Sequence, residues 1–97
     1  MDIAALVLTG ALALAPAPDL SVSTHGLDPA RASDAARLAE RFRDASRAWC
    51  GQHHRRVTPH ARAACEPEMR RRLAAALPPD DRRGFVRAGG MRVLNRR

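Results

Sequence analysis

Hydrophobic positions recur most regularly in the middle of the chain. Small or apolar side chains return there at alternating intervals of three and four residues, the spacing of one helix face. They are Ala35, Leu38, Phe42, Ala45 and Trp49. The pattern predicts an amphipathic helix over about residues 30–50, which starts at Asp28-Pro29 or Ser33-Asp34 and ends with Gly51 as its C′ residue. In so small a protein we expect this stripe to form the core; a partner-binding face is the alternative.

A different periodicity precedes this helix. Leu20-Ser21-Val22-Ser23-Thr24 alternates apolar and polar residues, which is typical of a β-strand with one buried face. His25-Gly26 follows and interrupts the alternation. The sequence therefore predicts a short N-terminal strand.

A second helix is predicted after a loop over residues 52–57. Thr58-Pro59 is a favourable cap and first position, and the following stretch to Leu77 is rich in Ala and Arg. Its apolar face is formed by Met69, Leu73 and Leu77. Pro67 lies inside it, and an internal proline costs a helix about 3 kcal/mol or more. We expect two pieces, 59–65 and 67–77, or one kinked helix, with Pro78-Pro79 ending it.

The last sixteen residues differ from the rest in composition. Residues 82–97 contain six arginines, three glycines and no acidic residue. Two short apolar stretches flank Ala88-Gly89-Gly90, which permits a hairpin, but an isolated hairpin is marginal in water. A disordered tail or a weak hairpin is expected here.

The amino terminus carries an apolar run from Ile3 to Ala15, followed by small residues in A-x-A order. The run is shorter than the roughly 20 residues of a transmembrane helix and has the length of a secretory signal core. We predict a signal peptide over residues 1–17, with an uncleaved anchor or a buried helix as alternatives. The mature protein is then periplasmic or secreted and has no stable membrane span.

Composition limits what such a chain can do. It has 97 residues and a mass of 10.6 kDa, enough for one small domain with a thin core. All 17 basic residues are arginine, and they outnumber 10 acidic residues to give a net charge of +7. No nucleophile motif or catalytic triad is recognisable, so we expect no catalysis, no cofactor and no small-molecule substrate.

The two cysteines, Cys50 and Cys65, admit two interpretations. In an exported protein they are expected to form a disulfide, and the closed loop of about 15 residues is worth about 3 kcal/mol. The alternative is a metal site, because His53 and His60 complete a set of four possible zinc ligands. Export favours the disulfide, while free thiols are a third state.

From Val22 to Cys65 the chain resembles the UrcA family of small exported bacterial proteins. Val22-Ser23 and Leu27-Asp28 correspond to that family's first motif, and Cys65 precedes an Ala-rich helix as its second cysteine does. The central motif is matched by Ala35, Leu38, Arg41, Phe42, Ala45, Ser46, Trp49, Cys50 and Gly51. The resemblance covers residues 20–77 and implies export and a disulfide. The family has no assigned biochemical activity, so no mechanism follows.

Arginine clusters suggest an alternative function in anion binding. Arg side chains bind phosphate and carboxylate groups through paired hydrogen bonds. The candidates are Arg70, Arg71, Arg72, Arg82, Arg83, Arg87, Arg92, Arg96 and Arg97. Lipid headgroups, polysaccharide or nucleic acid would be the ligands.

Together these patterns predict a small, mainly α-helical protein with a short N-terminal strand. A disulfide links its long first helix to its kinked second helix. Residues 18–81 form the domain and residues 82–97 the basic tail. Its expected role is structural or interactive, with an unidentified envelope protein or an anionic surface as partner.

Overall fold

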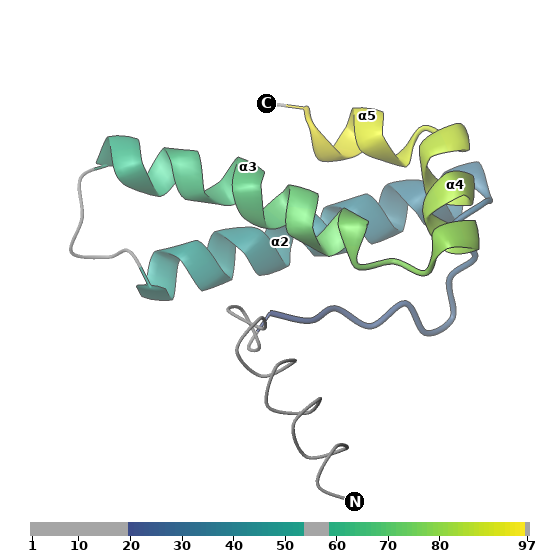
Figure 1. The fold of residues 1–97 in the computed structure, drawn as a ribbon, viewed down its shortest axis with the longest axis horizontal. Helices are drawn as coiled ribbons and strands as arrows, with labels where there is room; N and C mark the ends of the chain where they lie inside the picture. The colour runs from purple at the N-terminus through teal and green to yellow at the C-terminus, as the bar shows by residue number, and fades with distance from the viewer. Residues whose placement is uncertain (1–19, 54–58, 97) are drawn as a thin grey trace, which may run out of the picture.

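Four helices make up the regular structure in a computed structural model, which describes residues 20–53 and 59–96 (Figure 1). They are α2 (Ala32–His53), α3 (Pro59–Ala75), α4 (Pro79–Arg87) and α5 (Gly90–Leu94). The predicted signal peptide over residues 1–17 lies outside the described residues. The prediction of a small, mainly helical protein is confirmed.

Helix α2 follows the predicted apolar stripe but extends beyond its predicted end. The Asp28 side chain accepts a hydrogen bond from the Ala30 amide at 3.0 Å, and Asp34 accepts one from the Asp28 amide at 3.0 Å. These two bonds form the turn that precedes the first helical residue. The expected end at Gly51 is wrong, because the helix continues to His53. There the His53 ring is 2.9 Å from the Trp49 carbonyl oxygen, one of the last carbonyls of the helix.

Helix α3 runs without interruption through Pro67, so the alternative of two separate pieces is wrong. The three residues predicted for its apolar face, Met69, Leu73 and Leu77, are all buried. This packing continues on the C-terminal side of the proline and supports the helix there. A proline removes only one backbone donor, and burial of an apolar face outweighs that loss.

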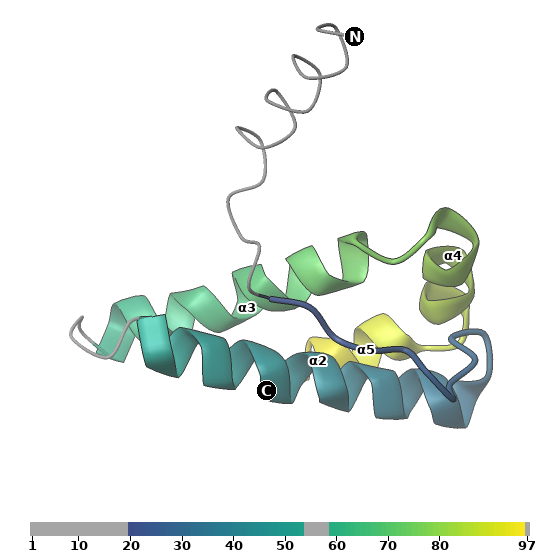
Figure 2. The same ribbon diagram turned by 90° about the horizontal axis from the view of Figure 1, so that it is seen from below.

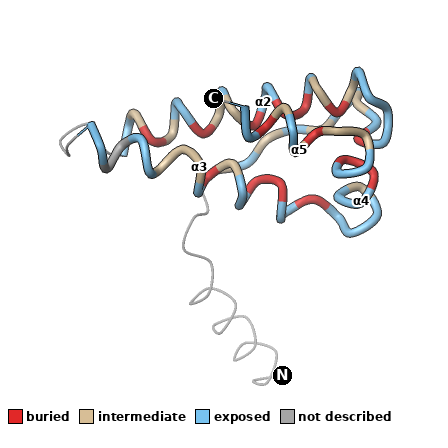
Figure 3. The backbone as a smooth tube through the Cα atoms, turned by 90° about the horizontal axis from the view of Figure 1, so that it is seen from above, coloured by how far each residue is buried: buried red, intermediate tan, exposed pale blue. Residues whose placement is uncertain are grey.

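Helices α2 and α3 lie side by side and run antiparallel (Figures 1 and 2). Their buried positions are drawn red in Figure 3 and alternate along each helix with exposed ones. The shared core contains Ala35, Leu38, Ala39, Phe42, Leu73, Ala74, Leu77, Phe85 and Leu94. The stripe is therefore core at Ala35, Leu38 and Phe42, as predicted, but the prediction does not hold for Trp49.

The predicted N-terminal strand is not present. Residues 20–24 form an extended segment with no regular structure, and no other extended segment in the described chain pairs with it. Its alternation still sets which side chains face inward: Leu20 and Val22 pack against the core, whereas Ser23 is exposed. The Arg41 guanidinium holds the segment by donating to the Ser23 carbonyl at 3.0 Å. The segment lies on α2 and α3, opposite α5 (Figures 1 and 2).

The prediction of a disordered tail or hairpin after residue 81 is also wrong. Pro79 occupies the first turn of α4, and Asp80 and Asp81 follow it near the positive end of the helix dipole. Phe85 is 0% exposed, and its ring centroid lies 5.7 Å from that of Phe42. This aromatic pair fixes α4 to the α2–α3 pair.

Helix α5 completes the core. Gly89 turns the chain after α4 with a φ of 89°, a conformation that favours glycine. Leu94 at the end of α5 is 0% exposed. The Arg43 guanidinium of α2 donates to the Leu94 carbonyl at 2.9 Å and also to the Arg96 carbonyl, which satisfies the end of the short helix. The last third of the chain is thus part of the folded domain.

Candidate functional site

The cysteines form the predicted disulfide. The Cys50 and Cys65 sulfur atoms are 1.98 Å apart, and the Cα atoms are separated by 6.0 Å. Cys50 lies near the end of α2 and is 0% exposed, while Cys65 is partly buried in the N-terminal half of α3. The bridge joins the last turns of α2 to the N-terminal half of α3. Residues 54–58, which connect the two helices in sequence, are outside the described residues.

The alternative zinc site does not form in this oxidised state. Both cysteine sulfurs are bonded to each other and offer no thiolate to a metal. His53 has its Nδ1 atom directed to the Trp49 carbonyl, and His60 is exposed at the start of α3. In the described part of the chain, no three His, Cys, Asp or Glu residues group as metal ligands.

Trp49 occupies a different environment from the rest of the stripe. The stripe places it in the core, but the structure leaves it partly exposed. Its ring stacks on the His53 ring, with centroids 4.0 Å apart and planes 16° from parallel. Trp49 belongs to the last turns of α2. Helices α4 and α5 do not reach the C-terminal end of α2 (Figure 1).

The three consecutive arginines of α3 differ in their exposure. Arg71 and Arg72 are exposed and both bind Glu68, at 2.5 and 3.2 Å. These hydrogen bonds, led by the one from Arg71, lower the pKa of Glu68 below its ordinary value of 4.5. Two of the predicted anion-binding arginines therefore already share one carboxylate within their own helix.

Arg70 lies against α2 instead of in solvent. Its side chain is 14% exposed, and its Nε atom is buried with no hydrogen-bond partner in the described chain. Burial lowers the pKa of Arg70, and the nearby positive charge of Arg43 lowers it further; Glu66, 3.8 Å away, opposes the shift. This arginine is a poorly compensated cation at the helix interface.

The arginines after residue 81 fall into two groups. Some are engaged within the fold: Arg82 donates to the Ala75 carbonyl at 3.0 Å, Arg83 pairs with Asp80, and Arg96 binds Glu40 at 2.8 Å. Arg87 and Arg92 are exposed and have no acidic partner among the described residues. Arg97 lies outside the described residues. The exposed positive charge is thus carried by ordered helices.

An apolar residue lies among these arginines, and the sequence patterns did not single it out. Val86 of α4 is 53% exposed, the large hydrophobic side chain most open to solvent in the described chain. Two shallow depressions meet at it, with volumes of about 440 and 340 Å³. The first is bordered by Arg82, Arg83 and Arg87. The sequence pattern that could have predicted α4 is Pro79-Asp80-Asp81, because proline and acidic residues favour the first turn of a helix.

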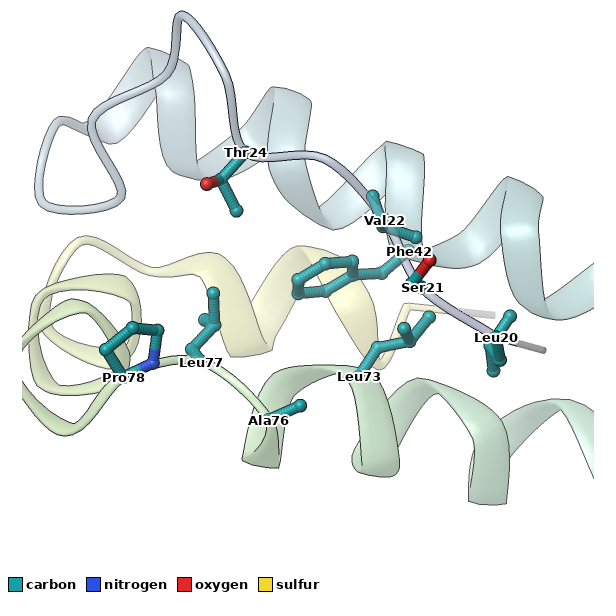
Figure 4. Close-up of a pocket in the computed structure, with 9 residues that line it drawn as sticks. All are labelled: Leu20, Ser21, Val22, Thr24, Phe42, Leu73, Ala76, Leu77 and Pro78. Atoms are coloured by element: carbon teal, nitrogen blue, oxygen red, sulfur yellow. The ribbon is translucent and has the colours of Figure 1, made fainter. Parts of the chain in front are cut away.

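A separate apolar groove lies under the extended N-terminal segment (Figure 4). Phe42 and Leu73 point into it from α2 and α3, and Leu77 points into it from the turn between α3 and α4. Val22 and Thr24 border it from the segment. Its volume is about 280 Å³, just below the range of about 300–1,000 Å³ for small-molecule sites. Three of its lining residues belong to the core. The groove is therefore the boundary along which the N-terminal segment packs against α2 and α3.

Over residues 20–53 and 59–96, no helix combines the length and apolar character needed to cross a bilayer. Comparison of the chain with protein-family models, with characterised proteins and with solved structures gives no match.

Proposed function

We propose that this chain is an exported, non-catalytic protein of the UrcA type that acts in the periplasm or outside the cell through binding. The observation that carries the proposal is the Cys50–Cys65 disulfide between α2 and α3. Disulfides persist in oxidising compartments and are rare in the cytosol. The apolar run at residues 3–15 supplies a matching export signal.

The small size of the core gives the disulfide a stabilising purpose. Among the large apolar side chains of residues 20–53 and 59–96, only Phe42, Phe85, Leu38 and Leu94 are fully buried. A domain of this size rarely gains more than about 3–5 kcal/mol from its core, and the bridge adds about 3 kcal/mol on the chain-entropy account. Oxidation after export would then complete folding.

The export proposal is tested by comparing the full chain with a version lacking residues 1–17 in a bacterial host. Thiols are blocked with an alkylating agent at lysis, and the intact masses are measured. The full chain should be recovered outside the cytoplasm, unalkylated and lighter than its reduced form by two hydrogen atoms. The shortened chain should stay in the cytoplasm with both thiols alkylated. Cytoplasmic retention of the full chain with alkylated thiols overturns the proposal.

A second candidate function is anion binding by arginine side chains. It is favoured by the exposed Arg87 and Arg92, which have no acidic partner in the described chain. Ordered arginines lose less conformational freedom on binding than those of a flexible tail. A salt-dependent affinity for a polyanion, lost on substitution of these two arginines, would establish it.

A further inference from the structure

The region around Val86 combines apolar and positively charged groups on one surface. We call it the Val86 surface and define it by six residues: Arg71, Arg82, Arg83, Val86, Arg87 and Met91. Val86 is 53% exposed, whereas its neighbour Phe85 is 0% exposed. The fold thus buries one large apolar residue of α4 and presents the next one to solvent. The exposed one is bordered by three arginines.

The floor of the second depression is apolar as well. It is formed by Ala74 and Ala75 of α3, Val86 of α4 and Met91 of α5, and Arg71 and Arg82 stand at its border. Three helices contribute, so the depression depends on the folded arrangement. An apolar floor with a cationic border fits a ligand that is itself apolar with a negatively charged group nearby.

The charges on this surface are only partly neutralised within the protein. Asp80 compensates Arg83, and Glu68 is shared between Arg71 and Arg72. Arg82 donates to a backbone carbonyl, which leaves its net charge in place, and Arg87 has no acidic partner among the described residues. From Arg82 to Arg96 the chain carries five arginines and no acidic residue. The local field therefore attracts anions.

We propose that the Val86 surface binds the face of a lipid bilayer that contains anionic headgroups. Val86 would enter the boundary between headgroups and acyl chains, and the surrounding arginines would contact phosphate groups. The identity of this partner rests on the export proposed above, which brings the protein to a membrane surface. Single-stranded nucleic acid fits less well, because its bases stack on exposed aromatic rings. Phe42 and Phe85 are buried, and Trp49 is stacked on His53.

The test uses purified protein of residues 18–97 with its disulfide intact, because the apolar run at residues 3–15 would itself bind lipid. This protein is mixed with vesicles of phosphatidylcholine alone or with added phosphatidylglycerol. The variants are Arg87→Gln and Val86→Ser. The matched control is Arg37→Gln, which removes the same charge from an exposed position of α2 outside the Val86 surface. Thermal melts confirm that each variant is folded, and co-sedimentation measures the partition coefficient.

The parent should bind the anionic vesicles, bind them more weakly as salt is added, and bind pure phosphatidylcholine far less. Arg87→Gln should lower the partition coefficient about fivefold, the effect of one arginine near an anionic surface. Val86→Ser should also lower it without changing the net charge. Arg37→Gln should change it by less than about twofold, because Arg37 lines neither depression of the Val86 surface.

Three results would overturn the proposal. Equal losses for Arg37→Gln and Arg87→Gln would mean that only the overall positive charge matters. Equal binding to both kinds of vesicle would mean that anionic headgroups do not contribute to binding. The third result is that the protein binds a nucleic acid duplex more tightly than vesicles and that Val86→Ser does not change this binding. The arginines would then serve to bind a polyanion and not a membrane. Purified protein is used throughout, so failure here leaves the export proposal standing, and failure of export leaves vesicle binding measurable.

Discussion

Replacement of Phe85 by alanine tests whether the last third of the chain belongs to the domain. Phe85 is 0% exposed, and its ring packs against Phe42 with centroids 5.7 Å apart and planes at 54°. Truncation of a buried phenylalanine costs about 3–5 kcal/mol, and an aromatic pair of this geometry adds about 0.5–1.5 kcal/mol to area burial. The core of so small a domain supplies about 3–5 kcal/mol and the disulfide about 3 kcal/mol more, so Phe85→Ala should remove most of the unfolding free energy of the oxidised protein.

The assay is urea denaturation of the oxidised protein, followed by circular dichroism at a helix wavelength. Val86→Ala is the matched control, because Val86 follows Phe85 in α4 but is 53% exposed. The control should stay within about 0.5 kcal/mol of the parent. Phe85→Leu keeps much of the buried volume and should lose less than Phe85→Ala, so a graded series is available if alanine prevents folding. Equal unfolding midpoints for the parent, Phe85→Ala and Val86→Ala would refute the packing of α4 on the core.

Four further changes test other features of the fold. Gly90→Ala should lower the melting temperature, because a Cβ atom there would lie 2.3–2.6 Å from ring atoms of Phe85; an unchanged melt would contradict this contact. Reduction of the Cys50–Cys65 bridge should lower the unfolding free energy by about 3 kcal/mol, as measured by urea denaturation with and without reductant. Ser46→Ala should leave the unfolding free energy unchanged or raise it, because the buried Ser46 hydroxyl has no hydrogen-bond partner in the described chain; a clear loss would reveal a partner. Because the pKa of Glu68 is lowered on folding, its ionised form stabilises the protein above its ordinary pKa of 4.5, and this stabilisation is lost as the pH falls through the lowered value. The melting temperature of the parent minus that of Glu68→Gln should therefore be largest near neutral pH and shrink in acid.

Local patterns were reliable where one helix face had to be buried along its whole length. The spacing of Leu38 and Phe42 in α2, and of Met69 and Leu73 in α3, predicted buried residues correctly. Such spacing depends only on the geometry of a single helix. The disulfide followed from an even cysteine count together with a predicted export signal, and the structure places the two residues on neighbouring helices.

Contacts between distant parts of the chain decided the features that the local sequence pattern predicted incorrectly. Residues 20–24 alternate as a strand does, but a strand needs a partner, and the described chain provides helices instead. The segment therefore buries alternate side chains against α2 and α3 without sheet hydrogen bonds. Trp49 lies on the predicted stripe, yet it is partly exposed because α4 and α5 cover only the other end of the helix pair.

The sequence by itself determined the two long helices, their buried faces and the cysteine pair, because each depends on residues close together in the chain or on their number. It did not determine the fate of residues 82–97. Their many arginines and glycines predict no stable structure for this segment alone. In the folded protein, however, Phe85 and Leu94 contact α2, which lies about fifty residues earlier in the chain. A short helix gains its stability from such packing and not from its own propensity. The same packing decides that Phe85 faces inward and Val86 outward, and so creates the surface proposed to meet a membrane.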